Sequence, residues 1–430
     1  MLELSPSDEA PVALGMPAAH ETATETASAR LSPATLEAMT QWPVYQWTQA
    51  EKAAQFNPLV AQLTRWHYQA CPAYRQLYDA FVGAPIATAS EAEATNAHIA
   101  TSAAMLDEST HVASTSAAST TTASTSIDST SSPARFALPV RLFKLHALQS
   151  VPDSEVVKTM LSSGTGGAQS RIVLDKTTAA LQTKILSRIV TDLIGKDRLP
   201  MLVLDCPATV KDRLKFSART AGVLGFSMYG RQLCYAFHDD MSLNDQAIAE
   251  FIERFGQGPV LLFGFTYIVW LHLVLALEQR GQRLALPHGI LIHGGGWKKL
   301  EHAAVSKDEF KQRLASVTGI RRVHNYYGMV EQTGTIFMEC SEGHLHCPVW
   351  ADIRVRDVLS QQLLSIGETG LLELTSLLPQ SYPGHVLLTE DVGRVLGVDD
   401  CPCGRHGVYF AVDGRIAHAE VRGCSDSYSR

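Results

Sequence analysis

The chain is short of basic residues, and this shortage excludes one class of protein. Its 36 Lys and Arg are outnumbered by 43 Asp and Glu, which gives a formal net charge of −7. A protein that binds nucleic acid needs a basic stripe to neutralise phosphates, and the sequence shows none. We therefore expect no nucleic-acid partner.

Cysteines are also sparse, with eight in 430 residues. Small secreted domains instead carry a dense set of cysteines that pair as disulfides. The first 35 residues lack the basic flank and apolar centre of a secretory signal. We therefore expect reduced thiols in a cytoplasmic protein.

Long apolar runs are scarce, apart from residues 259–277. This stretch is long enough to cross a bilayer by length alone. However, it contains His272, lacks a flanking basic cluster, and divides into a strand-like VLLFG and a helix-like TYIVWLHLVLALEQ. We expect a strand followed by a helix, and no stable membrane insertion.

Aromatic residues are absent from residues 84–134, where Ala, Ser and Thr dominate. Such a segment buries too little apolar surface to offset its ordering entropy, so we predict a disordered insertion. An Ala-rich helix over Ser90–Leu106 is the alternative. Residues 1–35 also have little to pack and predict a disordered tail. Between them, residues 36–83 combine aromatic and charged residues at helical spacing and predict a segment of two or three helices.

Residues 135–370 alternate apolar runs with helical runs. Residues 200–205 and 287–295 have the pattern of buried strands, and residues 177–194 and 308–317 that of helices. This alternation predicts a layered α/β core. Residues 371–430 have shorter runs between Pro and Gly, which predict a small β-rich subdomain with a C-terminal tail.

Four segments have residue types suited to a nucleotide. SSGTGG at 162–167 offers backbone amides and hydroxyls to phosphate oxygens, although no Walker lysine follows. GGGW at 294–297 ends a predicted strand, where open α/β sheets bind ligands. YYGMVEQTG at 326–334 offers an aromatic face to a base and a carboxylate to Mg²⁺, and TED at 389–391 an acid to a ribose. Taken singly, each segment also fits an ordinary turn.

The order of these segments, closed by GR at 414–415, resembles the adenylate-forming superfamily. More closely, it resembles the acyl-protein synthetase family, the fatty-acid–luciferin-component ligases of bacterial bioluminescence systems; phenylacetate–CoA ligases are more distant. The resemblance covers about residue 36 to the C-terminus, except the Ala/Ser/Thr insertion. It implies an α/β fold: an adenylate-forming-enzyme core with a small β-rich subdomain, lacking the superfamily's large C-terminal domain.

The resemblance also implies roles for individual residues. Glu331 would bind Mg²⁺, and Arg415 would lie at the domain junction near the phosphates. Ser170 stands where the superfamily usually has a lysine, so Arg171 would supply that charge. The residues that would bind ATP itself are Ser163, Gly164, Thr165 and Gly167 at the phosphates, Gly295, Gly296 and Tyr327 at the adenine, and Asp391 at the ribose.

The implied activity is ATP-dependent activation of a carboxylic acid, a long-chain fatty acid in this family, to an acyl-adenylate. Cys424, close to the C-terminus and near Arg422, would then take the acyl group as a thioester and pass it to a partner such as an acyl reductase. Two alternatives remain: an AMP-forming acid–CoA ligase, and a nucleotide-binding scaffold without turnover.

Two further groups of residues have two interpretations each. Cys401 and Cys403, with Cys340 and His346 upstream, suit a structural zinc ion, and His344 and Cys347 are alternative ligands. Buried free thiols explain the same cysteines without a metal. An aromatic group either lines a fatty-acid tunnel or packs in the core; its members are Phe263, Phe265, Tyr267 and Trp270.

Overall fold

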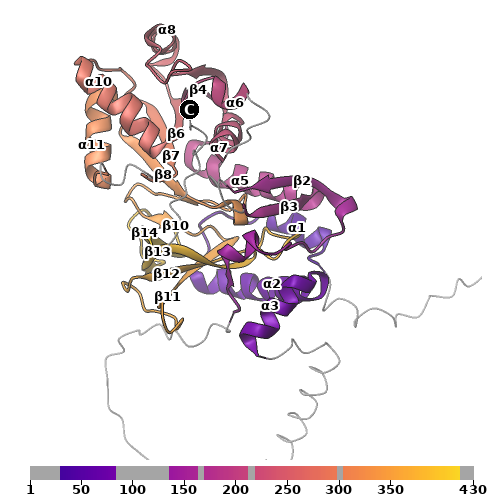
Figure 1. Ribbon diagram of the computed structural model, residues 1–430. Coiled ribbons are helices and arrows are strands. Elements are labelled where there is room, and N and C mark those ends of the chain that lie inside the picture. Colours follow the sequence, from indigo (N-terminus) through magenta and orange to yellow (C-terminus); the bar gives the residue numbers. More distant parts are fainter. Residues whose placement is uncertain (1–29, 84–134, 163–168, 212–217, 298–303, 417–430) are drawn as a thin grey trace, which may run out of the picture.

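The computed structural model describes residues 30–83, 135–162, 169–211, 218–297 and 304–416 (Figure 1). The predicted tail up to residue 29, the predicted insertion at 84–134 and its alternative helix lie outside these ranges. The helices are α1 (Pro33–Met39), α2 (Gln49–Ala70), α3 (Pro72–Val82), η1 (Val140–Lys144), η2 (Asp153–Glu155), α5 (Lys176–Ile194), α6 (Ala208–Lys211), α7 (Ala218–Ser227), α8 (Asp245–Phe255), α9 (Thr266–Ile268), η3 (Val269–Val274), α10 (Leu275–Arg280), α11 (Lys307–Thr318) and η5 (Val330–Gln332).

Within the described ranges, the strands form two six-stranded sheets and one hairpin. They are β1 (Leu138–Pro139), β2 (Val156–Leu161), β3 (Arg171–Asp175), β4 (Leu199–Leu204), β5 (Gly230–Tyr235), β6 (Val260–Phe265), β7 (Gly289–Gly294), β8 (Arg322–Tyr327), β9 (Phe337–Met338), β10 (Leu345–His346), β11 (Ala351–Arg356), β12 (Gly370–Ser376), β13 (Val386–Val398) and β14 (Val408–Arg415).

The N-terminal segment contains three helices, α1, α2 and α3, and the prediction was two or three. Thr48 and Glu51 form a capping box at the start of α2, which satisfies backbone donors at that end. Packing begins before the predicted boundary at residue 36, because Leu31 is buried and Arg30 pairs with Asp175 at 2.9 Å. In Figure 1, α2 and α3 lie beneath the second sheet, and α1 lies between α2 and the β2–β3 hairpin.

The first sheet has the strand order β5-β4-β6-β7-β8-β9 and is parallel except for β9. Both β6 and β7 are buried at every position, as expected for central strands covered by helices on both faces. Phe226 of α7 stacks on Phe263 on one face, and Phe310 of α11 lies against His293 on the other. The predicted strands at 200–205 and 287–295 and helices at 177–194 and 308–317 are confirmed as β4, β7, α5 and α11.

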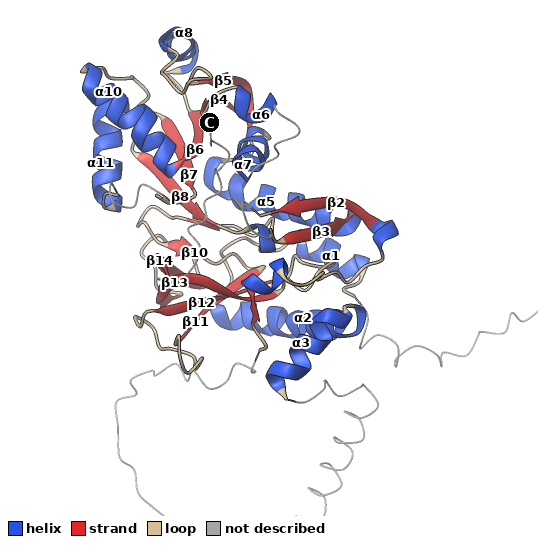
Figure 2. Cartoon of the chain, in the orientation of Figure 1, coloured by secondary structure: helices blue, strands red, loops and turns tan. Residues whose placement is uncertain are grey.

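The second sheet is mostly antiparallel and follows the order β10-β14-β13-β12-β11, with β1 added parallel to β13 (Figure 2). The second sheet also contains β1, β10 and β11, which all precede residue 371, where the predicted β-rich subdomain begins. The fold thus combines a layered α/β core with a β-rich part, which confirms the predicted fold class. The domain boundaries in the sequence stay a prediction.

The long apolar stretch divides as predicted into a strand, β6, and a following helix made of α9, η3 and α10. Among the described residues no helix is both long enough and apolar enough to cross a membrane. Phe263, Phe265 and Trp270 are each at most 3% exposed and belong to the main core, with Tyr267 packed against it. Core packing therefore accounts for this aromatic group.

Candidate active site

The predicted adenine-binding segment lies at the carboxyl ends of two neighbouring parallel strands. Gly294 at the end of β7 pairs in register with Tyr326 near the end of β8. Gly295 and Gly296 follow with φ of 84° and 60°, in the left-handed region that glycine tolerates. A Cβ on Gly295 would also lie 2.7 Å from the Phe265 ring. The chain therefore turns here on glycines alone, beside the end of β8 that carries Tyr327.

A hydrogen bond between the two sheets holds the predicted ribose-binding acid. The hydroxyl of Tyr327, on β8, donates to Oδ2 of Asp391, on β13, at 2.6 Å. Burial raises the pKa of Tyr327 well above its usual value, and the adjacent Asp391 raises it further, so the phenol keeps its proton. Nε of Arg415 reaches Oδ1 of the same carboxylate at 3.0 Å. Three residues predicted to share one site thus meet at the junction of the sheets.

This contact extends into a chain of charges that the sequence did not reveal. Arg415 also pairs with Glu390 at 3.0 Å, and Arg141 of η1 binds the other oxygen of Glu390 at 3.0 Å. Glu390 therefore holds one arginine from β14 and one from the segment before β2. Two features of the sequence point toward this contact: Glu390 is next to Asp391, and Arg141 belongs to the RLFK run at 141–144. Neither feature predicts that Glu390 and Arg141 pair with each other.

Glu331, the predicted Mg²⁺ ligand, lies in the short helix η5 just after β8 and is 5% exposed. Its backbone packs closely on the turn formed by SYPG at residues 381–384, since a Cβ on Gly384 would lie 2.6 Å from the Glu331 carbonyl oxygen. Burial, with a contribution from the Glu331 charge, raises the pKa of Tyr382 in that turn. A single carboxylate of this kind suits Mg²⁺, which keeps several waters and takes its other ligands from phosphates.

The predicted phosphate loop joins the strands of the β2–β3 hairpin. Ser163, Gly164, Thr165 and Gly167 lie outside the described residues, but the base of the loop is closed by two bonds. The amide of Ser162 donates to the Ser170 carbonyl at 3.0 Å, and the amide of Ser170 donates to Oγ of Ser162 at 2.9 Å. The hairpin packs on the Glu331 segment, because the Thr333 hydroxyl contacts Sδ of Met160 at 3.6 Å.

Arg171, the predicted substitute for the superfamily's lysine, is the first residue of β3 and is exposed. It lies opposite Leu161 across the hairpin, at the root of the loop. Cys424, the predicted acyl carrier, lies outside the described residues. The catalytic and nucleotide-binding roles given to all these residues stay predictions.

The cysteine and histidine group comes together in one place. The ligand atoms of Cys340, His346, Cys401 and Cys403 all lie within 4.8 Å of one another. Sγ of Cys340 is 4.0 Å from Sγ of Cys401, and Sγ of Cys403 is 3.4 Å from Nε2 of His346. Tetrahedral zinc with bonds of about 2.0–2.3 Å requires ligand atoms roughly 3.5–3.8 Å apart, and these four side chains lie close to that arrangement.

The two alternative ligands have different positions. Nδ1 of His344 lies 3.4 Å from Sγ of Cys401, at the edge of the cluster, whereas Cys347 is not one of the four clustered residues. Burial raises the pKa of the Cys401 thiol to about 12 and lowers that of His346 to about 4. A bound cation would lower the pKa of the Cys401 thiol again, because it stabilises the thiolate.

The chain is similar to known ligases in sequence. The family "Acyl-protein synthetase, LuxE" matches residues 133–430. A long-chain-fatty-acid–luciferin-component ligase of Vibrio harveyi is 23% identical over 325 residues, covering 68% of this chain and 76% of that protein. The protein of the same name from Aliivibrio fischeri is 27% identical over 172 residues, covering 39% of this chain and 44% of that protein.

Solved structures show a similar fold at low sequence identity. An open conformation of 2-hydroxyisobutyryl-CoA ligase, in complex with 2-HIB-AMP and CoA, has a TM-score of 0.55 at 16% identity and covers 87% of this chain and 77% of that one. The postadenylation state of that ligase, in complex with R3-HIB-AMP, has a TM-score of 0.54 at 16% identity, covering 86% and 69%. The fold is therefore that of the adenylate-forming ligases, and the chain belongs to the acyl-protein synthetase (LuxE) family of ligases.

Proposed function

We propose that this chain activates a long-chain fatty acid with ATP, transfers the acyl group to its own Cys424, and delivers it to an acyl reductase in the cytoplasm. The observation that carries the first step is the contact of Tyr327, Asp391 and Arg415 across the two sheets. It brings an aromatic ring, an acid and a cation to strand carboxyl ends, where open α/β sheets bind ligands. The acid substrate is suggested by the names of the two relatives.

In the first step an oxygen of the fatty carboxylate attacks the α-phosphorus of ATP. The bond from that phosphorus to the bridging oxygen breaks, pyrophosphate leaves, and an acyl-adenylate remains. Asp391 binds the ribose hydroxyls and Tyr327 lies against the base. Glu331 would hold Mg²⁺, and the ion would offset the charge that develops on the phosphates. Arg171 and the amides of the loop at 163–167 bind the remaining phosphate oxygens.

In the second step the Cys424 thiolate attacks the acyl carbonyl carbon. The bond to the adenylate oxygen breaks, AMP leaves, and a thioester forms, while the thiol proton passes to solvent. Arg422 favours the thiolate by its charge. The partner reductase then receives the acyl group from this thioester. The described cysteines are all free thiols, in keeping with a reducing compartment.

Pyrophosphate exchange tests the activation step. Labelled pyrophosphate is incubated with ATP, Mg²⁺, the protein and acids from two to eighteen carbons. We expect exchange that depends on a long-chain acid and is lost in Glu331→Ala. Glu253→Ala, which removes an exposed acid from α8, is the matched control and keeps exchange. Tight ATP binding without exchange for any acid would instead select the non-catalytic scaffold.

Labelling with a radioactive fatty acid tests the carrier step. Wild type and Cys234→Ser should both retain the label through denaturation and release it with hydroxylamine, whereas Cys424→Ser should not be labelled. An unchanged label in Cys424→Ser contradicts the carrier step without touching the activation step. Saturable release of an acyl-CoA that needs CoA and not Cys424 would select the acid–CoA ligase.

We also propose that Cys340, His346, Cys401 and Cys403 bind a structural zinc ion. The ion would join the loops after β9 and β13 to β10, so its removal should loosen this end of the second sheet. Elemental analysis of wild type and Cys234→Ser should show about one zinc per chain, and Cys403→Ser should show a large loss. A metal-free wild type, purified without chelators, would overturn this assignment.

A further inference from the structure

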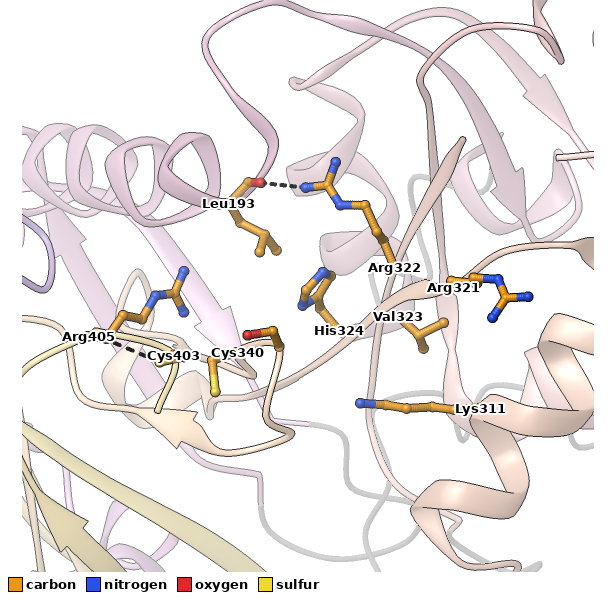
Figure 3. A pocket seen from close by; sticks show the side chains of 10 residues that line it. Leu193, Lys311, Arg321, Arg322, Val323, His324, Cys340, Cys403 and Arg405 are labelled. Atoms are coloured by element: carbon orange, nitrogen blue, oxygen red, sulfur yellow. Dashed lines mark hydrogen bonds between the residues drawn. The ribbon is translucent and has the colours of Figure 1, made fainter. Parts of the chain in front are cut away.

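A pocket of about 420 Å³ lies beside the amino end of β8, at the other end of the strand from Tyr327 (Figure 3). Its polar lining comes from residues 321–324 at the start of β8, Lys311 of α11, and the segments at residues 340–341 and 403–405. Leu193, at the end of α5, and Val323 add apolar surface. The pocket borders the Cys/His cluster and lies away from the strand ends at which we place the nucleotide.

The charged side chains that line this pocket are all cations. Lys311, Arg321, Arg322 and Arg405 contribute to the lining, and none of the carboxylates that the structure describes does. In Figure 3, Lys311, Arg322 and Arg405 lie around His324 on different sides, while the Arg321 side chain extends away from them at the edge of the pocket. Arginine is well suited to bind planar or tetrahedral oxyanions through paired N–H groups.

Neighbouring carboxylates neutralise only part of this charge. Lys311 pairs with the buried Glu339 at 3.2 Å, but Lys307 reaches the same oxygen at 3.4 Å. Arg405 pairs with Asp192 at 3.0 Å.

The two remaining arginines have no acidic partner among the described residues. Arg322 donates to the neutral carbonyl of Leu193 at 3.1 Å, and Arg321 has no hydrogen bond or ion pair in the described part of the chain. Zinc with three thiolates and one imidazole would add a single negative charge, so positive charge remains in excess.

A buried histidine also lines this space and has an unused ring nitrogen. His324 is 7% exposed, and its Nδ1 lies 3.0 Å from the carbonyl oxygen of Glu339, so Nδ1 carries the proton and donates. Its Nε2 is buried and has no hydrogen-bond partner among the described residues. A buried polar atom without a partner is costly, and a ligand that carries a hydroxyl or a protonated oxygen would satisfy it.

We propose that this pocket binds the phosphate group of a small phosphorylated molecule, at a site separate from the ATP site. Arg322 and Lys311 bind the phosphate oxygens, Arg321 adds positive charge at the edge of the pocket, and His324 accepts a hydrogen bond from a protonated oxygen of the ligand. The volume lies in the range of small-molecule sites, roughly 300–1,000 Å³, so it holds more than a bare phosphate. The apolar walls at Leu193 and Val323 then contact the organic part.

Calorimetric titration of the full chain tests this site, with inorganic phosphate and phenyl phosphate as probes at constant ionic strength in chloride. We expect saturable binding of both. Tighter binding of phenyl phosphate identifies an organic phosphate as the ligand, and equal binding identifies free phosphate. Arg321→Gln/Arg322→Gln should weaken both by about tenfold or more, because charge-assisted hydrogen bonds are lost.

The matched control is Arg75→Gln, which removes an exposed arginine from α3. It should bind both probes like wild type. Both arginines of the double variant are exposed, so its thermal unfolding should match that of wild type. Absence of saturable binding to wild type, or binding that the double variant leaves unchanged, would overturn the proposal. The second result would place the phosphate at another site, such as the nucleotide site.

Discussion

Two pairs of acids lie on the second sheet, and their surroundings differ. Asp352 on β11 pairs with Lys52 of α2 at 3.1 Å, and Glu373 on β12 is fully buried between Arg354 and Arg356. Glu390 and Asp391 on β13 also pair with arginines, but their partners Arg141 and Arg415 have side chains 55% and 30% exposed. We call the first pair, Asp352 and Glu373, the structural region and the second pair, Glu390 and Asp391, the junction region. In both regions each acid has a cation within hydrogen-bond distance.

The difference lies in what each pair of acids joins. Asp352 fastens a helix to the sheet, and Glu373 joins two neighbouring strands within it. Asp391 instead receives a hydrogen bond from Tyr327 of the other sheet, and its side chain is 17% exposed at the ends of the parallel strands. Paired buried charge is therefore common in this protein, and location at the junction of the sheets distinguishes the acids that we assign to ATP.

The largest effect on stability should come from Asp352→Ala. Lys52 is 1% exposed and would be left as a buried charge, which costs about 3–5 kcal/mol in unfolding free energy. Urea denaturation measures the loss. Asp391→Ala should cost less, because Arg415 reaches solvent and keeps Glu390 as a partner. Equal losses in the two variants would remove the distinction between the two regions.

Glu331→Gln should give the largest effect on activity without a comparable effect on stability. Loss of the charge that binds Mg²⁺ should lower the pyrophosphate-exchange rate by about 100–1,000-fold, as for other preorganised electrostatic groups. Glu373→Gln is the control, since it should destabilise the sheet while exchange per folded molecule stays near that of wild type. A normal rate in Glu331→Gln would contradict the Mg²⁺ assignment.

Asp391→Asn should raise the KM for ATP by about 10–100-fold, through loss of a charge-assisted hydrogen bond to the ribose. Steady-state kinetics at saturating fatty acid measure the change. Asp413→Asn removes an acid from the exposed Arg394–Asp413 pair nearby and should leave KM unaltered. If both variants raise KM equally, the effect is one of general surface charge.

The smallest effect is a pH dependence of opposite sign in the two regions. Burial acts to raise the pKa of Asp352, but Lys52 and nearby arginines together outweigh it and lower the pKa. The contribution of Asp352 to stability is therefore present above the unfolded value of about 3.9 and is lost as pH falls below it.

Burial raises the pKa of Asp391 in spite of Tyr327 and Arg415, so folding is favoured as that carboxyl takes up a proton. From pH 7 to pH 4, the stability of wild type should therefore rise relative to Asp391→Asn. The stability of wild type relative to Asp352→Asn should stay constant down to about pH 4 and should fall at lower pH. Urea unfolding at pH 7, 4 and 3 tests both signs; slopes of the same sign would contradict the contrast.

Much of the fold could be predicted because its signals are local. The runs that became β4, β6 and β7 are apolar at nearly every position, and α5 and α11 have helical spacing with acceptors at their starts, Asp175 and Ser306. The β1 strand could not be predicted this way, because it has only two residues, Leu138 and Pro139, and two residues show no periodic pattern. These residues pair with β13, about 250 residues later in the chain.

For the candidate site, the motifs predicted which residue types gather but not their partners. The sequence placed Tyr327 and Asp391 in one nucleotide site, and the structure joins them by a hydrogen bond. The role of Glu390 as the link between Arg141 and Arg415 was not predictable, because its partners lie 249 and 25 residues away. The basic pocket beside β8 was missed for the same reason.

The sequence by itself determined the family, the α/β core and the segments that carry glycine, aromatic and acidic side chains. These follow from neighbours along the chain, where backbone preference and apolar periodicity act. Only the tertiary structure decided which acids meet at the junction of the sheets, which thiols share a cluster, and which cations surround a pocket. Those contacts depend on how the two sheets pack, and packing joins residues that the chain keeps far apart.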